Sequence, residues 1–489
     1  MMRRLTIAVL AALASATLAP AQGSADPTLT LDDAIRLALG RNKNLKVVSF
    51  DRGISRALLL VARGHFDPAI VASRSALNQP EQLTPGYEQV YTFRQDTYSL
   101  GLGGQTPLGT TYSISTQVLD QRYSFNGYGN NYLVFAGFQV TQPLLKGFGL
   151  AANLENVRVA KANRGISDLQ YRQSAIDTVT NVIVAYSNLE LAHDVLDAAR
   201  RSRDAATSLL EANEKEYKVG AISQSDVTTA RFNVASQEEA ILIAERTVRD
   251  RQNMLRELIG DDVFLEDEPL FMLAPMQIPE VTVNLRADLS RALAERPDYL
   301  QARLGIVKNR EVEAAARNGV LPEVDFVGGY GYNGLGTTLS PSRAMVEQHD
   351  NPSYSAGLQV TIPLTFAVGR GNLRAARLQR QQSEEDLRRL EADIAVSVAN
   401  AAGQIDTTQK RVVADRAAYA LAKQALDAEE KKKLVGTSTT LAVVQQQQFV
   451  SIQEVNVSYT LASERQAVAL YDQQLGTTLE RYHINLASE

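Results

Sequence analysis

A long internal repeat constrains the fold of this chain more than any other feature of its sequence. Three short motifs recur 216 residues downstream: Val219-Gly220 as Val435-Gly436, Gln237-Glu238 as Gln453-Glu454, and Gly260 as Gly476. Residues 139–144 return as 359–364, and 31–39 are echoed more faintly by 285–293. A period this long is far more than one turn of a solenoid. It predicts a duplicated unit in which each half runs short helix, strands and two very long helices.

The two halves are expected to contribute to the same layers of a mixed α and β structure that is part barrel and part coiled coil. The first half is predicted at 29–260, with strands at about 67–143 and long helices at 150–219 and 224–259. A linker is predicted at 261–284. The second half spans 285–483, with strands at about 322–364 and long helices at 372–435 and 440–475. A helix of about 68 residues extends roughly 100 Å, so these helices are expected to project from any compact body.

The long helical segments carry the apolar spacing of coiled coils. They are rich in good helix formers and contain no proline. Apolar residues recur at heptad spacing in the first half, at Leu169, Ile176, Val179, Ile183 and Tyr186. The second half has a similar stripe at Leu387, Leu390, Ile394 and Val398. Arg172 and His193 interrupt the first seam.

The segments that precede the long helices alternate apolar and polar residues, as strands do. Tyr98, Leu100 and Leu102 follow this pattern in the first half, and Phe326, Tyr330 and Tyr332 in the second. Ten of the 18 tyrosines lie in such segments, at positions 87, 91, 98, 112, 123, 128, 132, 330, 332 and 354. Alternating strands with aromatic residues fit a tilted transmembrane barrel wall. A soluble β-sandwich with an aromatic core is the alternative for these segments.

Residues 1–21 are predicted to be a cleaved signal peptide. Arg3 and Arg4 give a positive start, residues 5–18 are apolar, and small residues precede a cut before Gln22, with Ala25 as a second candidate site. The apolar stretch is shorter than the roughly 20 residues that span a membrane, which disfavours the alternative of an N-terminal anchor. The chain has no cysteine, so neither disulfides nor N-terminal lipidation is expected.

Charge and motif content exclude several classes of function. The formal net charge is −5 and no basic tract is present, so no nucleic-acid partner is expected. The four histidines lack the spacing of metal ligands, and no nucleophile–base constellation or nucleotide-binding loop is evident. We therefore predict no enzyme activity, no metal and no cofactor. The run 431–433 of three lysines is read as a solvated helix end, with adaptor contact as the alternative.

The chain as a whole resembles the TolC-like outer-membrane efflux proteins. The resemblance covers residues 29–483 and is carried by the leader, the opening LTLDDAI at 29–35, Gln142-Pro143-Leu144, the Val-Gly turns and the twofold repeat. Phe66-Asp67-Pro68 and 144–149 (LLKGFG) are similar to a branch with an elaborated first barrel section. The resemblance implies a homotrimer, with one shared β-barrel in outer-membrane lipid and one α-helical tunnel through the periplasm of a Gram-negative-type bacterium.

The same resemblance implies a function and a set of site residues. It implies a passive exit duct for a tripartite efflux or type I secretion system, docked to a periplasmic adaptor and driven by an inner-membrane pump. The two reversals would form the periplasmic tip that contacts the adaptor, at Val219, Gly220, Val435, Gly436 and Thr437. Asp226 is a gate candidate. In the second half, Ala442 and Gln445 stand where relatives commonly carry acidic residues, which leaves Gln445 as a weaker gate candidate. A soluble periplasmic coiled-coil scaffold or adaptor is the alternative function.

The number of barrel strands is the open question of the sequence. The first half has about 77 residues from Phe66 to Pro143, against about 43 from Val320 to Pro363 in the second. Two alternating runs at 97–105 and 110–121, joined by a tight turn at 106–109, occupy the extra length. They predict four strands from the first half and two from the second, or 18 in a trimer. The alternative is a hairpin that stands above a 12-stranded wall.

Overall fold

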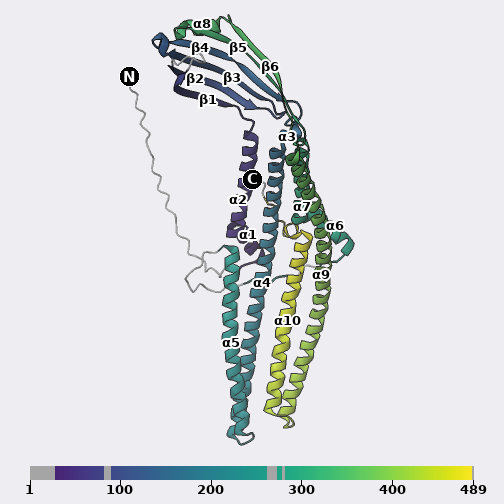
Figure 1. The fold of residues 1–489 in the computed structure, drawn as a ribbon. Coiled ribbons are helices and arrows are strands. Elements are labelled where there is room, and N and C mark those ends of the chain that lie inside the picture. The colour runs from purple at the N-terminus through teal and green to yellow at the C-terminus, as the bar shows by residue number, and fades with distance from the viewer. Residues whose placement is uncertain (1–27, 82–89, 261–272, 278–280, 487–489) are drawn as a thin grey trace, which may run out of the picture.

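The computed structural model describes residues 28–81, 90–260, 273–277 and 281–486. The predicted signal peptide at 1–21 and most of the predicted linker at 261–284 lie outside the described residues. The described chain has two parts, a curved sheet and a set of long helices that extend away from one end of it (Figure 1). Among the described helices, none combines the length and apolarity needed to cross a membrane.

One six-stranded antiparallel sheet contains all the described strands. Its spatial order follows the chain: β1 (Ala69–Glu81), β2 (Tyr91–Gln105), β3 (Thr111–Tyr123), β4 (Asn131–Pro143), β5 (Glu323–Gly336) and β6 (Pro352–Thr361). The first half of the repeat supplies four of these strands and the second half supplies two. The two halves meet where β4 pairs with β5, from Tyr132 opposite Gly336 to Pro143 opposite Asp325.

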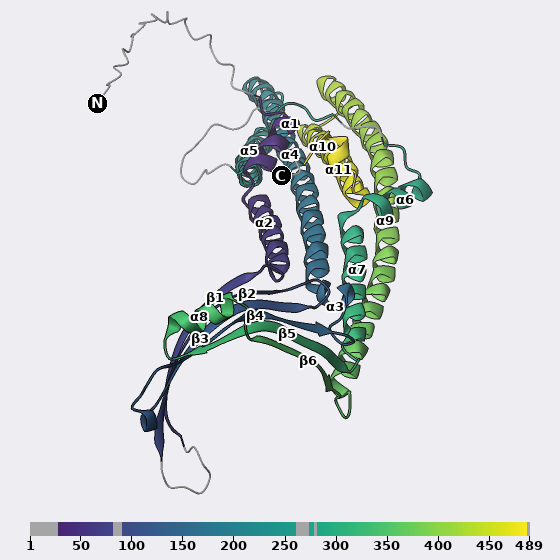
Figure 2. The same cartoon turned by 90° about the horizontal axis from the view of Figure 1, so that it is seen from above.

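The helices next to the sheet form one row. They are α2 (Lys43–Gly64), α4 (Glu155–Lys218), α7 (Pro297–Asn318) and α9 (Ala367–Leu434), in that order across the molecule (Figure 2). Farther from the sheet, α5 (Gln224–Ile259) and α10 (Thr440–Leu475) replace α2 and α7 beside the continuous α4 and α9 (Figure 1). Shorter helices are α1 (Leu31–Arg41), α3 (Leu150–Asn153), α6 (Leu285–Glu295), α8 (Leu339–Glu347), α11 (Thr478–Arg481) and a 3₁₀ turn, η1 (Ser124–Asn126).

The expected order of short helix, strands and two long helices is incomplete, because each half has a second helix before its strands. α2 follows α1 after the single residue Asn42, whose side-chain oxygen accepts from Leu45 N at 3.0 Å and so caps α2. α7 follows α6 in the same way and begins with Pro297. α2 buries only Leu45 and Leu59 within this chain, so its apolar residues form no stripe against the rest of the protomer.

Two long-helix boundaries also differ from the sequence prediction. The segment expected as one helix from 150 is split at Leu154 into α3 and α4. α9 begins at Ala367, before the expected 372, and runs through Gly369 and Gly371. A Cβ on Gly369 would lie 2.7 Å from the carbonyl oxygen of Gly319. This glycine therefore permits close packing of α9 on the end of α7, although glycine is a weak helix former.

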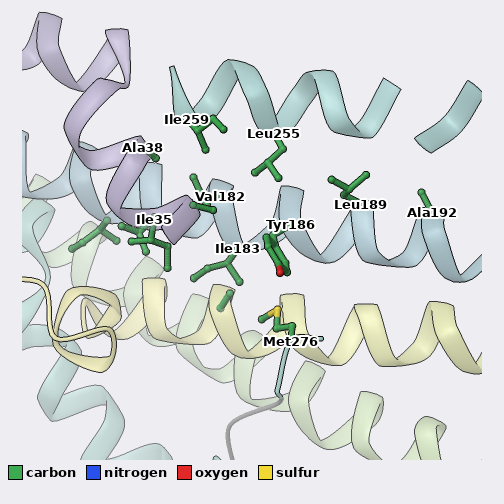
Figure 3. Packing of buried hydrophobic residues seen from close by; sticks show 14 of the residues in the cluster. Ile35, Ala38, Val182, Ile183, Tyr186, Leu189, Ala192, Leu255, Ile259 and Met276 are labelled. Atoms are coloured by element: carbon green, nitrogen blue, oxygen red, sulfur yellow. The ribbon is translucent and has the colours of Figure 1, made fainter. Parts of the chain in front are cut away.

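The main core lies at the middle of the helical part and contains four of the five residues of the predicted heptad stripe, without Leu169. Ile176, Val179, Ile183 and Tyr186 of α4 are fully buried in a cluster with residues of α1, α5 and the 273–277 segment. Figure 3 shows Ile183 and Tyr186 in this cluster. The Tyr186 hydroxyl lies 2.8 Å from Leu29 O and 2.7 Å from Ala274 O. Burial raises the pKa of this hydroxyl to about 12, so it stays protonated as a donor. A second core holds Ile394 and Val398 of α9.

Candidate functional site

The two faces of the sheet differ in polarity, and the even-numbered and odd-numbered strand residues lie on opposite faces. Even-numbered positions in the part of the sheet nearer the helices are mainly apolar or glycine, and many of the apolar side chains are exposed, among them Ile70, Leu100, Leu102, Ile114, Phe138, Phe326, Tyr330, Tyr354 and Leu358. Odd-numbered positions of the same strands are mainly serine, threonine, glutamine and glycine, including Ser73, Ser99, Ser113, Ser115, Gln139, Ser353 and Gln359. Paired partners keep this parity, as in Leu102 opposite Ile114 and Phe138 opposite Tyr330. A wall with one apolar and one polar face is the result.

The turn between β2 and β3 lies at the helix end of the sheet. Gly149 N, just before α3, donates to Leu108 O at 3.0 Å, and Gln105 Nε2 donates to Asn153 Oδ1 at 3.0 Å. Gly109 has a φ of +94° and passes beside Gly147 O, which leaves no room for a Cβ. Within this protomer, the alternative of a hairpin above a four-strand wall is therefore wrong, and β2 and β3 are part of the wall.

The first hairpin tip is a tight reversal with a complete helix cap. Gly220 adopts a φ of +76°, and Ala221 N donates to Glu216 O at 2.9 Å to close the end of α4. Val219 is 80% exposed at this turn. Asp226 accepts from Ser223 N at 3.1 Å while Ser223 Oγ accepts from Asp226 N at 3.3 Å, which is a capping box for α5. Within the protomer, the Asp226 carboxylate is thus engaged in its own helix start.

The second tip has the same backbone and a weaker cap. Gly436 also has a φ of +76°, Thr437 N donates to Lys432 O at 2.9 Å, and Val435 is 74% exposed. Thr439 Oγ1 accepts from Ala442 N at 3.2 Å, but alanine cannot return the second bond of a capping box. Gln445 is exposed one turn farther along α10. The carboxylate at this tip belongs to Glu429, and hydrogen bonds from Ser438 and then Lys432 lower its pKa.

A buried amide that sequence analysis missed joins the two hairpins near their tips. Asn213 of α4 is fully buried, and its Oδ1 accepts from Lys433 Nζ of α9 at 2.7 Å. Its Nδ2 lies 3.3 Å from Thr440 Oγ1 of α10. The expectation of a solvated 431–433 is wrong for Lys433, whose side chain is only 14% exposed. Asn213 occupies a heptad row whose preceding members are Ala192, Ala199 and Ala206, and a polar residue in such a row was the available signal.

Other polar contacts between the hairpins lie between this amide and the main core. Arg201 of α4 pairs with Glu454 of α10 at 3.0 Å, and Ser202 Oγ lies 3.0 Å from Ser451 Oγ. A cavity of about 190 Å³ lies beside them, and the side-chain oxygens of Asn233 and Gln447 are buried there without a partner. The hairpins therefore meet through polar groups in this region, whereas the two apolar cores lie closer to the sheet.

Comparisons with known proteins agree with this architecture. The family described as outer membrane efflux protein matches residues 34–261 and 289–480. Outer membrane protein TolC of Escherichia coli (strain K12) is 23% identical over 353 residues, which cover 70% of this chain and 68% of TolC. Alkaline protease secretion protein AprF of Pseudomonas aeruginosa is 27% identical over 213 residues, or 41% of this chain and 40% of AprF. The CmeC outer membrane channel of Campylobacter jejuni superposes with a TM-score of 0.67 at 16% identity, over 91% of this chain and 85% of CmeC.

The family match follows the internal repeat, because its two matched stretches correspond to the two halves of the chain. The solved channel has the same fold across nearly the whole chain. Together with the wall of one apolar and one polar face, these matches assign the chain to a membrane channel architecture. This chain belongs to the outer membrane efflux protein family.

Proposed function

We propose that three copies of this chain form an outer-membrane channel that serves as the exit duct of a tripartite export system. The observation that carries the proposal is the sheet, whose edge strands β1 and β6 each pair on one side only within the described chain. Unpaired backbone groups in lipid cost several kcal/mol each, so a membrane sheet must close on itself. Pairing β6 of one copy with β1 of the next closes it.

Threefold closure of this sheet gives a barrel of 18 strands. Six strands per copy is too few for a barrel with a water-filled interior, whereas barrels of 16 to 18 strands leave an aqueous channel. The apolar even-numbered face then contacts lipid and the polar odd-numbered face lines the lumen. A solute would pass from the helical tunnel, which α9 extends by roughly 100 Å, into this polar barrel.

The neighbouring copy also accounts for an apolar stripe on α2. Val47, Phe50, Ile54, Leu58 and Val61 recur every three or four residues and are 56% to 70% exposed. α2 leads directly into β1 and β6 leads directly into α9, so edge-to-edge pairing of the sheets brings α2 of one copy beside α9 of the next. The stripe is then buried in a helix–helix contact of the tunnel wall.

The hairpin tips are the proposed adaptor contacts and gate. Val219, Gly220, Val435, Gly436 and Thr437 present small and exposed apolar surface at the end farthest from the sheet (Figure 1). Asp226 and Gln445 stay gate candidates, with Asp226 also part of the α5 cap. We propose that the duct itself is passive and that an inner-membrane pump supplies the energy for transport through it.

Two kinds of cargo are compatible with this duct. One is small molecules, which efflux through such a duct would remove, and the other is polypeptides, since AprF is named for secretion of alkaline protease. The alternative of a soluble periplasmic scaffold is disfavoured by apolar residues on this face of the sheet, such as Ile70, Tyr354 and Leu358, which are 67% to 83% exposed.

Mass measurement of the purified protein in mild detergent tests the assembly. We expect a trimer that forms ion-conducting pores in planar bilayers. A stable folded monomer would refute threefold closure. Recovery of the protein in the periplasmic fraction without detergent would refute the membrane location and support the scaffold alternative.

A further inference from the structure

The loop that joins β4 to α3 carries apolar side chains that are exposed in this protomer. Leu144, Leu145 and Phe148 are 42% to 47% exposed, and so are the adjacent Leu108, in the β2–β3 turn, and Leu150, at the start of α3. We call these five residues the collar. Fully burying one leucine or phenylalanine is favourable by about 1.5–3 kcal/mol, so a cluster of five left half-exposed calls for a partner.

The backbone under the collar is fixed by hydrogen bonds. Leu144 N donates to Val324 O at 2.7 Å, and Gly147 N donates to Asn318 Oδ1 at 2.6 Å. Asn153 Nδ2 donates to the carbonyl oxygens of Gly147 and Gly149, at 2.7 and 2.9 Å. Gly147 and Gly149 adopt φ values of +85° and +91°, a conformation that favours glycine. The exposed side chains are therefore held in place by the fold and do not belong to a loosely held loop.

Another copy of the chain does not cover the collar. Neighbouring copies are expected to join at β1 and β6, which are the edges of the sheet. The collar lies at the foot of β4, with β3 on one side and β5 on the other, where α3 connects the sheet to the helices (Figure 2). Its partner must approach from the outer or the inner side of the wall.

Along β2 and β3, the distance from the collar to the first charges on the apolar face matches the thickness of a membrane. Asp96 and Asp120 are opposite each other on β2 and β3, at even-numbered positions, and each is 12 residues from Leu108. At about 3.3 Å per residue and a strand tilt of roughly 40°, this corresponds to about 30 Å along the membrane normal. The even-numbered residues between Leu108 and Asp120, in the turn and on β3, are all uncharged: Thr110, Tyr112, Ile114, Thr116 and Val118.

Charged groups lie at both ends of this apolar span. At the far end, Arg122 pairs with Asp120 and, at 3.2 Å, with Asp96. At the collar end, Lys146 lies between the apolar residues and pairs with Glu323 at 3.2 Å, with both side chains more than 40% exposed. A lysine among leucines and phenylalanine suits the headgroup zone, where the ammonium reaches water and phosphate while the stem stays in an apolar environment.

We propose that the collar inserts into the periplasmic leaflet of the outer membrane and fixes the height of the barrel in the bilayer. Its side chains then lie at the boundary of acyl chains and headgroups, with Lys146 directed to lipid phosphates. This inference rests on the proposed membrane function and adds to it a lipid contact outside the strands. The arrangement gives the chain a rigid membrane anchor at the junction of barrel and tunnel.

Tryptophan fluorescence tests the proposal directly, because the chain contains no tryptophan. Three single variants would be reconstituted as purified channels in phosphatidylcholine vesicles: Phe148→Trp in the collar, Phe138→Trp on the apolar face of β4, and Val219→Trp at a hairpin tip. Each is measured with lipid brominated near the carbonyl, with lipid brominated deep in the acyl chain, and with iodide in water. Trimer mass confirms that each variant folds, and Leu145→Trp replaces Phe148→Trp if that variant does not.

We expect emission from residue 148 to be lost most strongly with shallow bromine, and emission from 138 with deep bromine. Residue 219 should respond to iodide alone. Quenching of residue 148 by iodide alone would place the collar in the lumen or in bulk water and overturn the proposal. Insensitivity of residue 148 to all three quenchers would show a protein contact and also overturn it. Failure of residue 138 to respond to bromine would instead refute the membrane orientation of the sheet.

Discussion

Replacing Asn213 by alanine tests whether a buried amide ties the two hairpins together. The change removes the acceptor of Lys433 Nζ at 2.7 Å and the group 3.3 Å from Thr440 Oγ1. A hydrogen bond to a charged group contributes about 1.5–3 kcal/mol and a neutral one about 1 kcal/mol. Lys433 keeps only a distant ion pair with Glu216, at 3.9 Å. We therefore expect a loss of about 2–3 kcal/mol in local stability at the tips.

Amide hydrogen exchange is the suitable assay, because it reports local opening of a helix end within an otherwise intact protein. A loss of about 2 kcal/mol corresponds to roughly 30-fold faster exchange through that opening. We expect the increase in the last turns of α4 and α9 and the first turns of α5 and α10. Amides around Ile176 and Ile183, in the main core, should keep their exchange rates.

Two further substitutions make the result specific. Asn181→Ala changes an exposed asparagine of the same helix and should leave exchange at the tips unchanged. Asn213→Asp keeps an acceptor for Lys433 and should preserve most of the protection. If Asn213→Ala behaves like Asn181→Ala, the amide does not hold the hairpins together and the reasoning from its burial is refuted.

Three other predictions concern the tips and the helices near the sheet. Asp226→Ala should raise single-channel conductance in planar bilayers, whereas Ser223→Ala, which removes only the cap acceptor, should not; equal effects would reduce Asp226 to a capping residue. Gly220→Ala should destabilise the first tip by about 1–2 kcal/mol because of its positive φ, while Gly403→Ala, at an exposed site inside α9, should stabilise the helix by up to about 1 kcal/mol, both measured by thermal unfolding. Glu313, buried against Arg380 and Arg317 at 2.7 and 2.8 Å, has its pKa lowered from 4.5 to about 2 by hydrogen bonds from those two residues. Its stabilising effect is therefore complete above about pH 4.5 and lost as the pH falls toward 2, and Glu313→Gln should remove this part of the acid dependence of unfolding.

The long helices could be predicted from the sequence because their signals are local. Helix starts are marked by Ser223 and Thr439, and helix ends by Gly220, Gly260, Gly436 and Gly476. The apolar residues at heptad spacing predict which side chains of a helix are buried. The bounds of α5 and α10 accordingly match the expected 224–259 and 440–475. α2 was not predicted, although Val47, Phe50, Ile54, Leu58 and Val61 recur at helical spacing. That spacing is typical of a helix packed on the core of its own chain, and it does not show that these side chains are exposed in the protomer.

The number of strands could be predicted from the lengths of the connections between them. The turn at 106–109 is tight and the connection at 124–130 is longer, and in outer-membrane barrels short turns and long loops lie on opposite sides. That rule placed Leu108 at the helix end, where the bond from Gly149 N holds it. α8 was not predicted, since its Ser-Pro-Ser sequence reads as loop. Its position over Gly334, where a Cβ would clash with Ser342 O, is set by tertiary packing alone.

The repeat has diverged at the place where its function is proposed to lie. The first tip is closed by its own capping box, from Ser223 and Asp226. The second tip lacks that box, because Ala442 stands in place of an acidic residue, and relies on contacts of Lys433 and Thr440 with Asn213 of the first hairpin. In a trimer, six tips would alternate between a self-capped hairpin and one that its neighbour supports. Loss of the Asn213 contacts should therefore release the second hairpin of each pair before the first, which makes α9 and α10 the expected moving elements of the tip.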